Sequence, residues 1–196
     1  RDAAISPDGS RIAFTFKGDI YTVPTSGGKA SRLTALPSLE WAPVWSPDGT
    51  KIAFATDRNG GSDIYIMGAD GGHATRLTFD SASETPEAFT PDGTEIVFSA
   101  AIQDAPSSVM FPTARLTEVY TVPAAGGRTR QLLSTPAEKI SYLPDGKSFL
   151  YHDVKGMENK FRKHHTSSVT RDIWLYDAKS GRHTNLTNRY GEDRNP

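Results

Sequence analysis

The residues best suited to chemistry lie in one basic segment, residues 154–171. The segment contains five basic residues and one acidic residue, which give it a net charge of +4. These residues are Lys155, Lys160, Arg162, Lys163, Arg171 and the acidic Glu158. Arginine can hold a carboxylate through paired hydrogen bonds, and His164 and His165 add groups that titrate near neutral pH. Three interpretations stay open: a solvated loop, a site for a ligand carboxylate, or a contact to another domain or subunit.

The same segment does not predict catalysis. His165 and Ser167 are close in the chain, but no third group orients the histidine and no glycine elbow presents a nucleophile. Adjacent histidines in extended chain point apart, and no matching ligand spacing follows His164 and His165, so we expect no metal there. We expect no catalytic residue and no cofactor in this chain.

A second unusual segment, residues 100–117, has an apolar centre formed by Val109, Met110 and Phe111, with Arg115 close behind. Such a centre is uncommon in an exposed loop and indicates either packing or an interface with another domain or chain. Packing within the parent protein is the favoured interpretation, and a separate binding site ranks third.

Both segments interrupt a sequence repeat that occurs four times in the chain. Each copy opens with a proline-aspartate-glycine turn, at Pro7-Asp8-Gly9, Pro47-Asp48-Gly49, Pro91-Asp92-Gly93 and Pro144-Asp145-Gly146. An apolar run follows, then an acidic, a β-branched and an aromatic residue, at Asp19-Ile20-Tyr21, Asp63-Ile64-Tyr65, Glu118-Val119-Tyr120 and Asp172-Ile173-Trp174. A glycine turn and a short leucine strand end each copy. Four short strands per period predict an all-β protein, a β-propeller with four four-stranded blades present.

The spacing of the repeat shows where insertions are tolerated. The acidic residue of the third-strand motif and the leucine of the last strand are 14 positions apart in every copy (19 to 33, 63 to 77, 118 to 132, 172 to 186). From the turn glycine to the acidic residue the gap varies as 10, 14, 25 and 26. We therefore expect the length variation to lie in surface loops between second and third strands, all on one face. Turn chemistry accounts for Asp8, Asp48, Asp92 and Asp145, and we expect the third-strand acid to hydrogen-bond to a backbone turn.

The expected blades cover residues 1–40, 41–84, 85–137 and 138–190, with 191–196 starting a further blade. The chain begins inside a strand and stops at Asn195-Pro196, where the earlier copies lead into their next first strand. We therefore expect a fragment of a six- or seven-bladed ring, although a closed ring of four blades is allowed, since propellers have about 4 to 8 blades.

The repeat resembles the propellers of TolB-like proteins, prolyl oligopeptidases and tricorn proteases. The last insert is more specific, and it is similar to the N-terminal propeller of bacterial tricorn-like serine peptidases over Arg162-Lys163-His164-His165-Thr166-Ser167-Ser168-Val169-Thr170-Arg171-Asp172-Ile173-Trp174 and Gly191-Glu192-Asp193-Arg194-Asn195-Pro196. The opening Ile5-Ser6-Pro7-Asp8-Gly9 and Gly18-Asp19-Ile20-Tyr21 match the same region. The resemblance implies a second propeller, a PDZ module and a C-terminal serine peptidase core, all outside these residues.

The resemblance also implies that a basic cluster on the propeller anchors the C-terminal carboxylate of a peptide substrate. The candidates are Arg162, Lys163, His164, His165 and Arg171, with peptides or unfolded polypeptide as ligands and the PDZ and catalytic domains as partners. The alternative is a TolB-like protein-interaction propeller without a peptidase. A propeller that binds a sugar or small ligand ranks last, because the inserts are basic and aliphatic.

Composition limits the other classes of function. The 196 residues include 22 basic and 23 acidic residues, so no global charge attracts nucleic acid. No run approaches about 18 apolar residues, so no membrane span is expected. Cysteine is absent, which excludes disulfides and thiol chemistry but fits a reducing or an oxidising compartment. The resemblance favours a periplasmic or otherwise exported protein, with a cytoplasmic location and a homo-oligomer left open.

Overall fold

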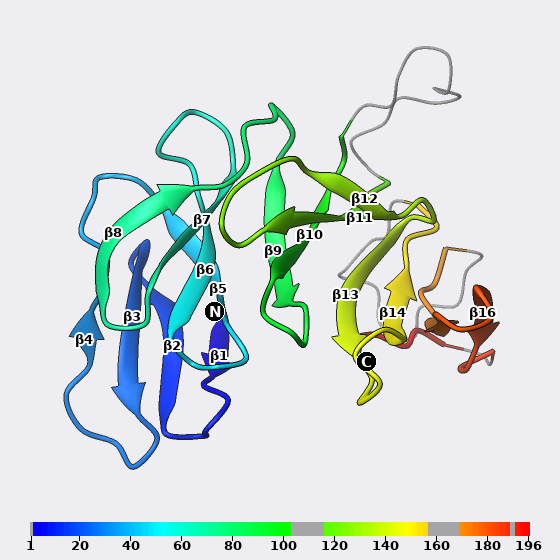
Figure 1. Ribbon diagram of the computed structural model, residues 1–196, viewed down its shortest axis with the longest axis horizontal. Helices are drawn as coiled ribbons and strands as arrows, with labels where there is room; N and C mark the ends of the chain where they lie inside the picture. The colour runs from blue at the N-terminus through cyan, green and yellow to red at the C-terminus, as the bar shows by residue number, and fades with distance from the viewer. Residues whose placement is uncertain (1, 103–115, 157–168, 189–190) are drawn as a thin grey trace.

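The chain folds into four antiparallel sheets that follow one another in sequence order (Figure 1). The structure is a computed structural model that describes residues 2–102, 116–156, 169–188 and 191–196. The described residues form sixteen strands and no helix, and none of them makes a helical segment of the length and apolar character that crossing a membrane requires. Each sheet contains four consecutive strands, every one paired with its neighbour in the chain.

The strand bounds follow the repeat. The first sheet contains β1 (Ala3–Ile5), β2 (Arg11–Phe16), β3 (Asp19–Pro24) and β4 (Ser31–Arg32). The second contains β5 (Glu40–Trp45), β6 (Lys51–Thr56), β7 (Asp63–Gly68) and β8 (Gly71–Arg76). The third contains β9 (Glu84–Phe89), β10 (Glu95–Ala100), β11 (Glu118–Pro123) and β12 (Arg130–Leu133). The fourth contains β13 (Ala137–Tyr142), β14 (Phe149–Asp153), β15 (Ile173–Asp177) and β16 (Arg182–Asn185).

The proline-aspartate-glycine turns join the first and second strands of each sheet, as the repeat predicts. In the second sheet, Asp48 accepts hydrogen bonds from the Ser46 hydroxyl at 2.6 Å and the Thr50 amide at 3.0 Å. The bond from Ser46 contributes most to lowering the pKa of Asp48 to about 2, followed by the bonds from Thr50. Gly49 completes the turn with a φ of 70°, a conformation that favours glycine.

Replacing Gly49 by alanine is expected to destabilise the fold by about 1 kcal/mol. An added Cβ would meet only Pro7 Cδ, at an ordinary 3.8 Å, so the cost comes from the left-handed backbone. Gly61→Ala is the matched control, because Gly61 has neither a positive φ nor a neighbour within 4 Å. Urea denaturation of both variants checks this, and an equal loss in the two would contradict the turn argument.

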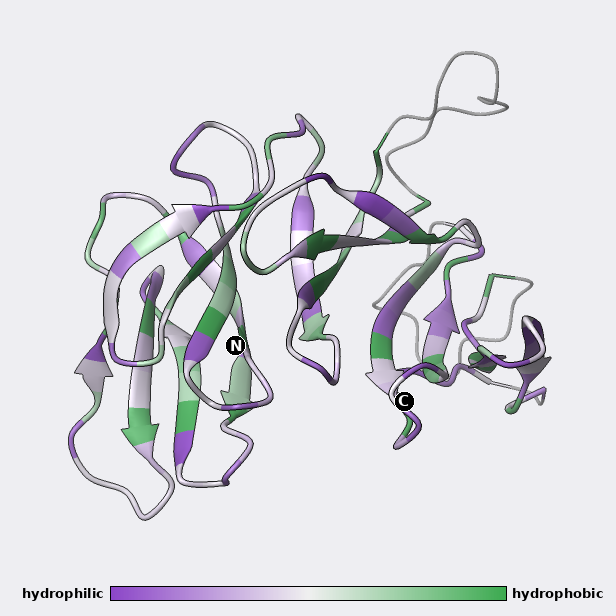
Figure 2. Ribbon diagram, viewed as in Figure 1, coloured by the Kyte–Doolittle hydropathy of each residue, from purple (hydrophilic) through white to green (hydrophobic). Residues whose placement is uncertain are grey.

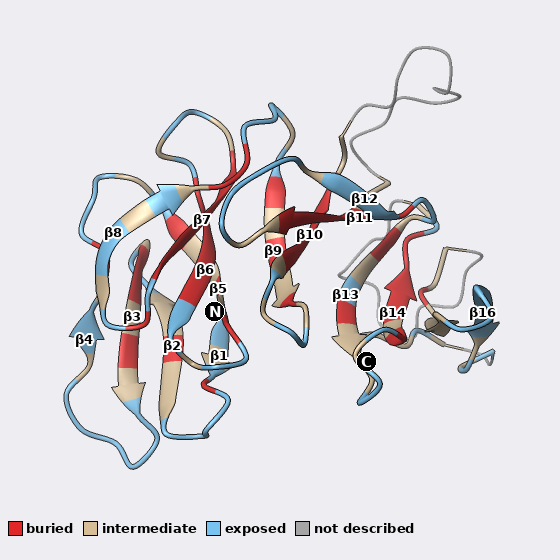
Figure 3. Cartoon of the chain, viewed as in Figure 1, coloured by how far each residue is buried: buried red, intermediate tan, exposed pale blue. Residues whose placement is uncertain are grey.

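The hydrophobic core lies between sheets. One cluster joins Ile64, Ile66 and Leu77 of the second repeat to Phe98 and Tyr120 of the third. A second cluster joins the first two sheets and a third joins the last two. Figures 2 and 3 show the same pattern most clearly in the second and third sheets, where β6, β7, β10 and β11 are both apolar and buried, while the fourth strand of each sheet is largely exposed. Strands covered on both faces account for the continuous apolar runs of the repeat.

One backbone hydrogen bond recurs at each junction between sheets. The amide of Glu40, the first residue of β5, donates to the Gly18 carbonyl at 2.7 Å. The first residues of β9 and β13 donate in the same way to the carbonyls of Ser62 and Thr117, at 3.0 and 2.9 Å. Each accepting residue directly precedes the acidic residue of a third-strand motif. Asp193 makes the same bond to the Arg171 carbonyl at 2.9 Å. Residues 191–196 therefore lie against the fourth sheet as β5, β9 and β13 lie against the sheets before them.

A cavity of about 620 Å³ is lined by Asp2, Ala3, all three of these first strands and Asn195-Pro196.

Candidate functional site

Most of the predicted site residues lie outside the described part of the chain. These are Arg162, Lys163, His164 and His165 of the basic segment and Val109, Met110, Phe111 and Arg115 of the apolar one. Arg171 is described, together with both ends of the basic segment. The site is therefore built from the residues that hold these ends.

The topology places the elaborated connections on one face. Because consecutive strands are antiparallel, the links between second and third strands (17–18, 57–62, 101–117 and 154–172) emerge at the same end as the links between sheets. We call this end the insert face, and the proline-aspartate-glycine turns lie at the opposite end. The link of two residues in the first sheet and the long ones in the third and fourth confirm that insertions gather between second and third strands.

Arg171 anchors the C-terminal end of the basic segment in a buried network. Its Nη1 donates to Glu138 Oε2 at 2.7 Å and lies 2.7 Å from His152 Nε2. Thr117 donates to the other oxygen of Glu138 at 2.7 Å. The hydrogen bond with His152 contributes most to holding the pKa of Glu138 well below its ordinary value, and the bonds from Thr117 and Arg171 add to it against the effect of burial.

Lys155 closes the other end of the segment. Its Nζ donates to the Thr170 carbonyl at 2.8 Å and to Asp172 Oδ2 at 2.6 Å, and Asp153 Oδ2 lies 3.3 Å away. Burial favours the neutral amine, but the bond to Asp172 and the charge of Asp153 outweigh it and raise the pKa of Lys155. Since Lys155 bonds directly to Thr170, the two ends of the basic segment are held side by side at the insert face.

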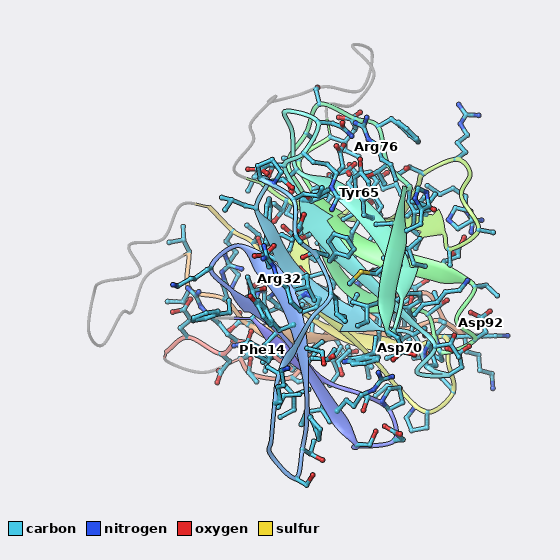
Figure 4. The ribbon with its side chains drawn as sticks, turned by 90° about the vertical axis from the view of Figure 1, so that its left-hand side faces the viewer. Phe14, Arg32, Tyr65, Asp70, Arg76 and Asp92 are labelled. Carbon is cyan, nitrogen blue, oxygen red and sulfur yellow. The ribbon has the colours of Figure 1, made fainter. Side chains whose placement is uncertain are left out.

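The third-strand acids have side-chain partners that the sequence reasoning missed. We expected these acids to bond to a backbone turn, but each one binds the residue thirteen positions later on the fourth strand. Asp19 pairs with Arg32 at 2.7 Å and Asp63 with Arg76 at 2.9 Å, and both arginines are labelled in Figure 4. Glu118 accepts from Gln131 at 2.7 Å and Asp172 from Asn185 at 3.2 Å. The constant spacing of the hairpin was the signal that could have revealed these pairs.

Exposed apolar side chains also gather on the insert face. Phe16 ends β2, while Leu36, Leu39 and Phe79 belong to the links between sheets, and all four are exposed. Cations lie over two of these rings, with Lys17 Nζ 5.6 Å from the centre of Phe16 and the Arg76 guanidinium 4.7 Å from that of Phe79. Aromatic and aliphatic groups beside cations are suited to binding polypeptide.

Three histidines lie in the described part of the chain. His73 and His183 are exposed on outer strands, while His152 is buried on β14 and takes part in the Arg171 network. Within the described ranges, no three histidine, aspartate or glutamate side chains gather in a way that could hold a metal ion.

Comparisons with known proteins agree with this architecture. Tricorn protease homolog 1 of Streptomyces coelicolor is 41% identical over 54 residues, which is 28% of this chain and 5% of that protein. A protein assigned as TolB from Agrobacterium tumefaciens superposes with a TM-score of 0.71 and 25% identity, covering 97% of this chain and 65% of its own. The tricorn protease structure gives a TM-score of 0.67 at 14% identity, covering 94% of this chain and 22% of its own.

The chain therefore spans only a small part of the length of its tricorn relatives. The activities of those relatives are activities of proteins much longer than this chain. The family model of the tricorn protease N-terminal β-propeller domain matches residues 1–196, the whole chain. The protein belongs to the tricorn protease N-terminal β-propeller family.

Proposed function

We propose that this chain is the non-catalytic propeller module of a tricorn-type peptidase, which gates or anchors peptides for a serine peptidase core outside these residues. The observation that carries the proposal is the basic segment, in which Lys155 and Arg171 hold the two ends. Between these ends the chain has three basic residues against one acidic residue, a net charge of +2. A family match over the whole chain supports the link to a peptidase. Peptides and unfolded polypeptide are the proposed ligands.

The geometry divides the roles of the basic residues. Arg171 Nη1 is committed to Glu138 and His152, so we assign Arg171 to holding the segment in place. Arg162 and Lys163 are the proposed carboxylate-binding residues, with His164 and His165 adding charge as pH falls. An arginine and a lysine at one site can hold a C-terminal carboxylate by paired hydrogen bonds and charge.

In the full-length enzyme, replacing Arg162 and Lys163 together by alanine is expected to raise KM for peptides with a free C-terminus about tenfold, since one lost charge-assisted contact is worth about 1.5 kcal/mol. KM for the same peptides with an amidated C-terminus should not change. Steady-state kinetics on matched peptide pairs measure both. Equal changes for free and amidated peptides would contradict carboxylate anchoring.

The control for this experiment removes one arginine and one lysine from the opposite end of the sheets. Lys147 and Arg182 are both exposed, and they lie at the proline-aspartate-glycine turn and the outer hairpin of the fourth sheet. The Lys147→Ala, Arg182→Ala double variant should leave KM for both kinds of peptide unchanged. A rise in KM with this variant would indicate that the overall charge of the protein, and not a local site, determines peptide binding.

The second candidate is a TolB-like protein-interaction propeller without a peptidase. The similarity to the Agrobacterium protein and the exposed Phe16, Leu36, Leu39 and Phe79 favour it. Under this proposal the segment with Val109, Met110, Phe111 and Arg115 would add to the docking surface. Sequencing the gene beyond Pro196 separates the two, because only the first proposal requires a PDZ module and a serine peptidase core downstream.

We further propose that residues 191–196 start another blade of a six- or seven-bladed ring, supported by the shared hydrogen bond of Asp193 and β5, β9 and β13. Export to the periplasm fits a peptidase that trims peptides and stays a prediction. Cryo-electron microscopy of the full-length protein would count the blades directly.

A further inference from the structure

The outer strand of the second sheet has a free edge. β8 is the last strand in the order β5-β6-β7-β8, so within the described part of the chain it pairs with β7 alone. It runs for six residues, Gly71–Arg76, whereas the other outer strands contain two or four. Figure 1 shows β8 on the outer side of the molecule, and Figure 3 shows that its residues are exposed or half-buried. A free edge of this length can accept a further strand.

The main chain of β8 presents hydrogen-bonding groups along this edge. Thr75 is paired with a residue of β7, and Leu77, just past β8, donates its amide to the Ile64 carbonyl at 2.9 Å. In an antiparallel ladder, the residues that alternate with such positions turn their amides and carbonyls to the other side. Ala74 and Arg76 therefore present backbone donors and acceptors away from β7.

A pocket of about 400 Å³ lies beside β8, between the second and third sheets. Thr75 of β8 is part of its lining. Its apolar lining residues are Ile66, Met67, Leu77, Ala124 and Ala125. A pocket of this size is large enough for an apolar side chain. Successive side chains of a strand point to opposite faces, so a strand added to β8 would direct every second side chain toward the third sheet and the pocket.

The first two sheets have an ion pair at the equivalent position. Arg11, the first residue of β2, donates to Asp70 at 2.7 Å and lies 4.9 Å from the centre of the Trp45 ring. Asp70 stands in the turn between β7 and β8 and is labelled in Figure 4. These side chains therefore bridge the first and second sheets.

The second and third sheets cannot form this bridge. Lys51, the first residue of β6, corresponds to Arg11, and Ala125 corresponds to Asp70. The alanine before Asp70 and the alanine before Ala125 fix the equivalence, because each donates its amide to the carbonyl just before the second strand of its own sheet. An alanine side chain cannot pair with a lysine. Lys51 and Ala125 both line the pocket instead.

The third sheet has an ion pair of another kind at the matching residues. Glu95 starts β10 as Lys51 starts β6, and Arg130 occupies the place of Thr75 in the pairing with the preceding strand. Arg130 donates to Glu95. The second sheet therefore combines a long free edge with a pocket that neither kind of ion pair closes.

The charges around the pocket indicate what kind of segment fits it. Lys51 and His73 line the pocket beside uncharged residues only. An acidic side chain next to an apolar one would complement the charge of Lys51.

We propose that β8 binds an extended polypeptide segment as a fifth strand, with an apolar side chain in the pocket and an acidic side chain beside Lys51. Main-chain hydrogen bonds to β8 provide affinity, and the pocket provides selectivity. The site includes Thr50 and Ala125, which lie at the end of the sheets opposite the insert face. The inference therefore goes beyond the proposed function and does not rest on it.

The test is calorimetric titration of the purified protein with the peptide acetyl-Thr-Val-Thr-Leu-Asp-Val-Thr-amide. Its blocked ends separate this site from carboxylate anchoring. Replacing the leucine of the peptide by alanine should weaken binding about tenfold, and replacing its aspartate by asparagine about threefold. Two further forms carry N-methyl groups on alternate amides, one form for each edge of the peptide. One form should lose binding and the other should keep it, because a strand pairs with β8 through one edge.

Ala125→Asp restores the acid that Asp70 supplies in the second sheet, and we expect it to weaken peptide binding about tenfold by pairing with Lys51. Ala125 is exposed, so the variant should fold. Ser26→Asp is the matched control, because it adds the same acid at the equivalent exposed turn position of the first sheet, outside the pocket. It should leave the affinity unchanged. The double variant Lys51→Glu, Thr75→Arg copies the pair of Glu95 and Arg130 and should also weaken binding.

Three results would each overturn the proposal: no saturable binding up to about 1 mM peptide, equal effects of the two N-methylated forms, or wild-type affinity in Ala125→Asp. Sedimentation velocity adds a fourth. A dimer that excludes the peptide would assign the edge of β8 to a second copy of this chain. None of these outcomes depends on peptidase activity or on Arg162 and Lys163, so failure here leaves the proposed function standing.

Discussion

Replacing Arg171 by alanine is expected to lower the free energy of unfolding by about 2 kcal/mol, because it removes a charge-assisted hydrogen bond to the partly buried Glu138 carboxylate. Arg171 is only 9% exposed, and its Nη1 contacts both Glu138 and His152 at 2.7 Å. The variant also removes the side-chain contacts that join the end of the basic segment to β13 and β14. Urea denaturation followed by intrinsic fluorescence measures the loss.

A double-mutant cycle separates the ion pair from other effects. Glu138→Gln keeps the size of the side chain and removes its charge, so Arg171→Ala in the Glu138→Gln background should cost clearly less than in the wild type. Arg182→Ala, at an exposed position on β16, should change stability by less than about 0.5 kcal/mol. Additive losses from Arg171 and Glu138 would show that the two side chains do not stabilise the fold as a pair.

The pH dependence gives the cycle an independent check. The folded protein holds the pKa of Glu138 below its ordinary value of 4.5, so the ionised side chain stabilises the fold at and above that pH. The contribution is lost as pH falls below 4.5 toward the folded pKa. The difference in stability between wild type and Glu138→Gln should therefore narrow in acid. A difference that stays constant down to pH 3 would contradict the assignment.

The local features of the fold were predictable because short-range chemistry determines them. The turn around Asp48 and Gly49 needs only neighbours within two or three residues, and a turn residue of this kind is recognisable in any sequence. The strands followed from apolar runs such as Ile52-Ala53-Phe54, all fully buried. The constant length of the outer hairpin fixed its register, which in turn pairs Asp63 with Arg76.

The candidate site was less predictable because its contacts join distant parts of the chain. Glu138 and Arg171 are 33 residues apart, and nothing in the spacing of the repeat brings them together. The basic pattern suggested Arg171 as a ligand-binding residue, while the structure surrounds it with Glu138 and His152 at the base of the segment. Charge alone does not distinguish a cation that faces a ligand from one that holds a loop.

The difference between Arg58 and Ile102 shows a further limit. Both residues stand in links that vary in length, so a repeat aligned by its turns and strands leaves them unmatched. Only the register that pairs Glu40 with Thr56 and Glu84 with Ala100 makes them equivalent. The buried Glu40 accepts a hydrogen bond from Arg58 at 2.8 Å, whereas Ile102 stands at the matching position beside the buried Glu84.

Replacing Phe98 by alanine is expected to lower the free energy of unfolding by about 4 kcal/mol, the usual cost of removing a buried aromatic side chain. Phe98 is fully buried, packs in the cluster with Ile64 and Leu77, and stacks on Tyr120 with ring centres 5.8 Å apart. Phe16→Ala is the control, because Phe16 is 53% exposed and should cost less than about 1 kcal/mol. Chemical denaturation measures both.

Hydrogen exchange on Phe98→Ala then tests where the core lies. The cluster around Phe98 belongs to the second and third sheets together, so the variant should lose protection in β7 as well as in β10, although Phe98 is on β10 alone. If each sheet were stabilised by its own core, protection would fall in β9 to β12 only. Shared loss is the result expected of a propeller, because a twisted four-stranded sheet buries its faces only against its neighbours.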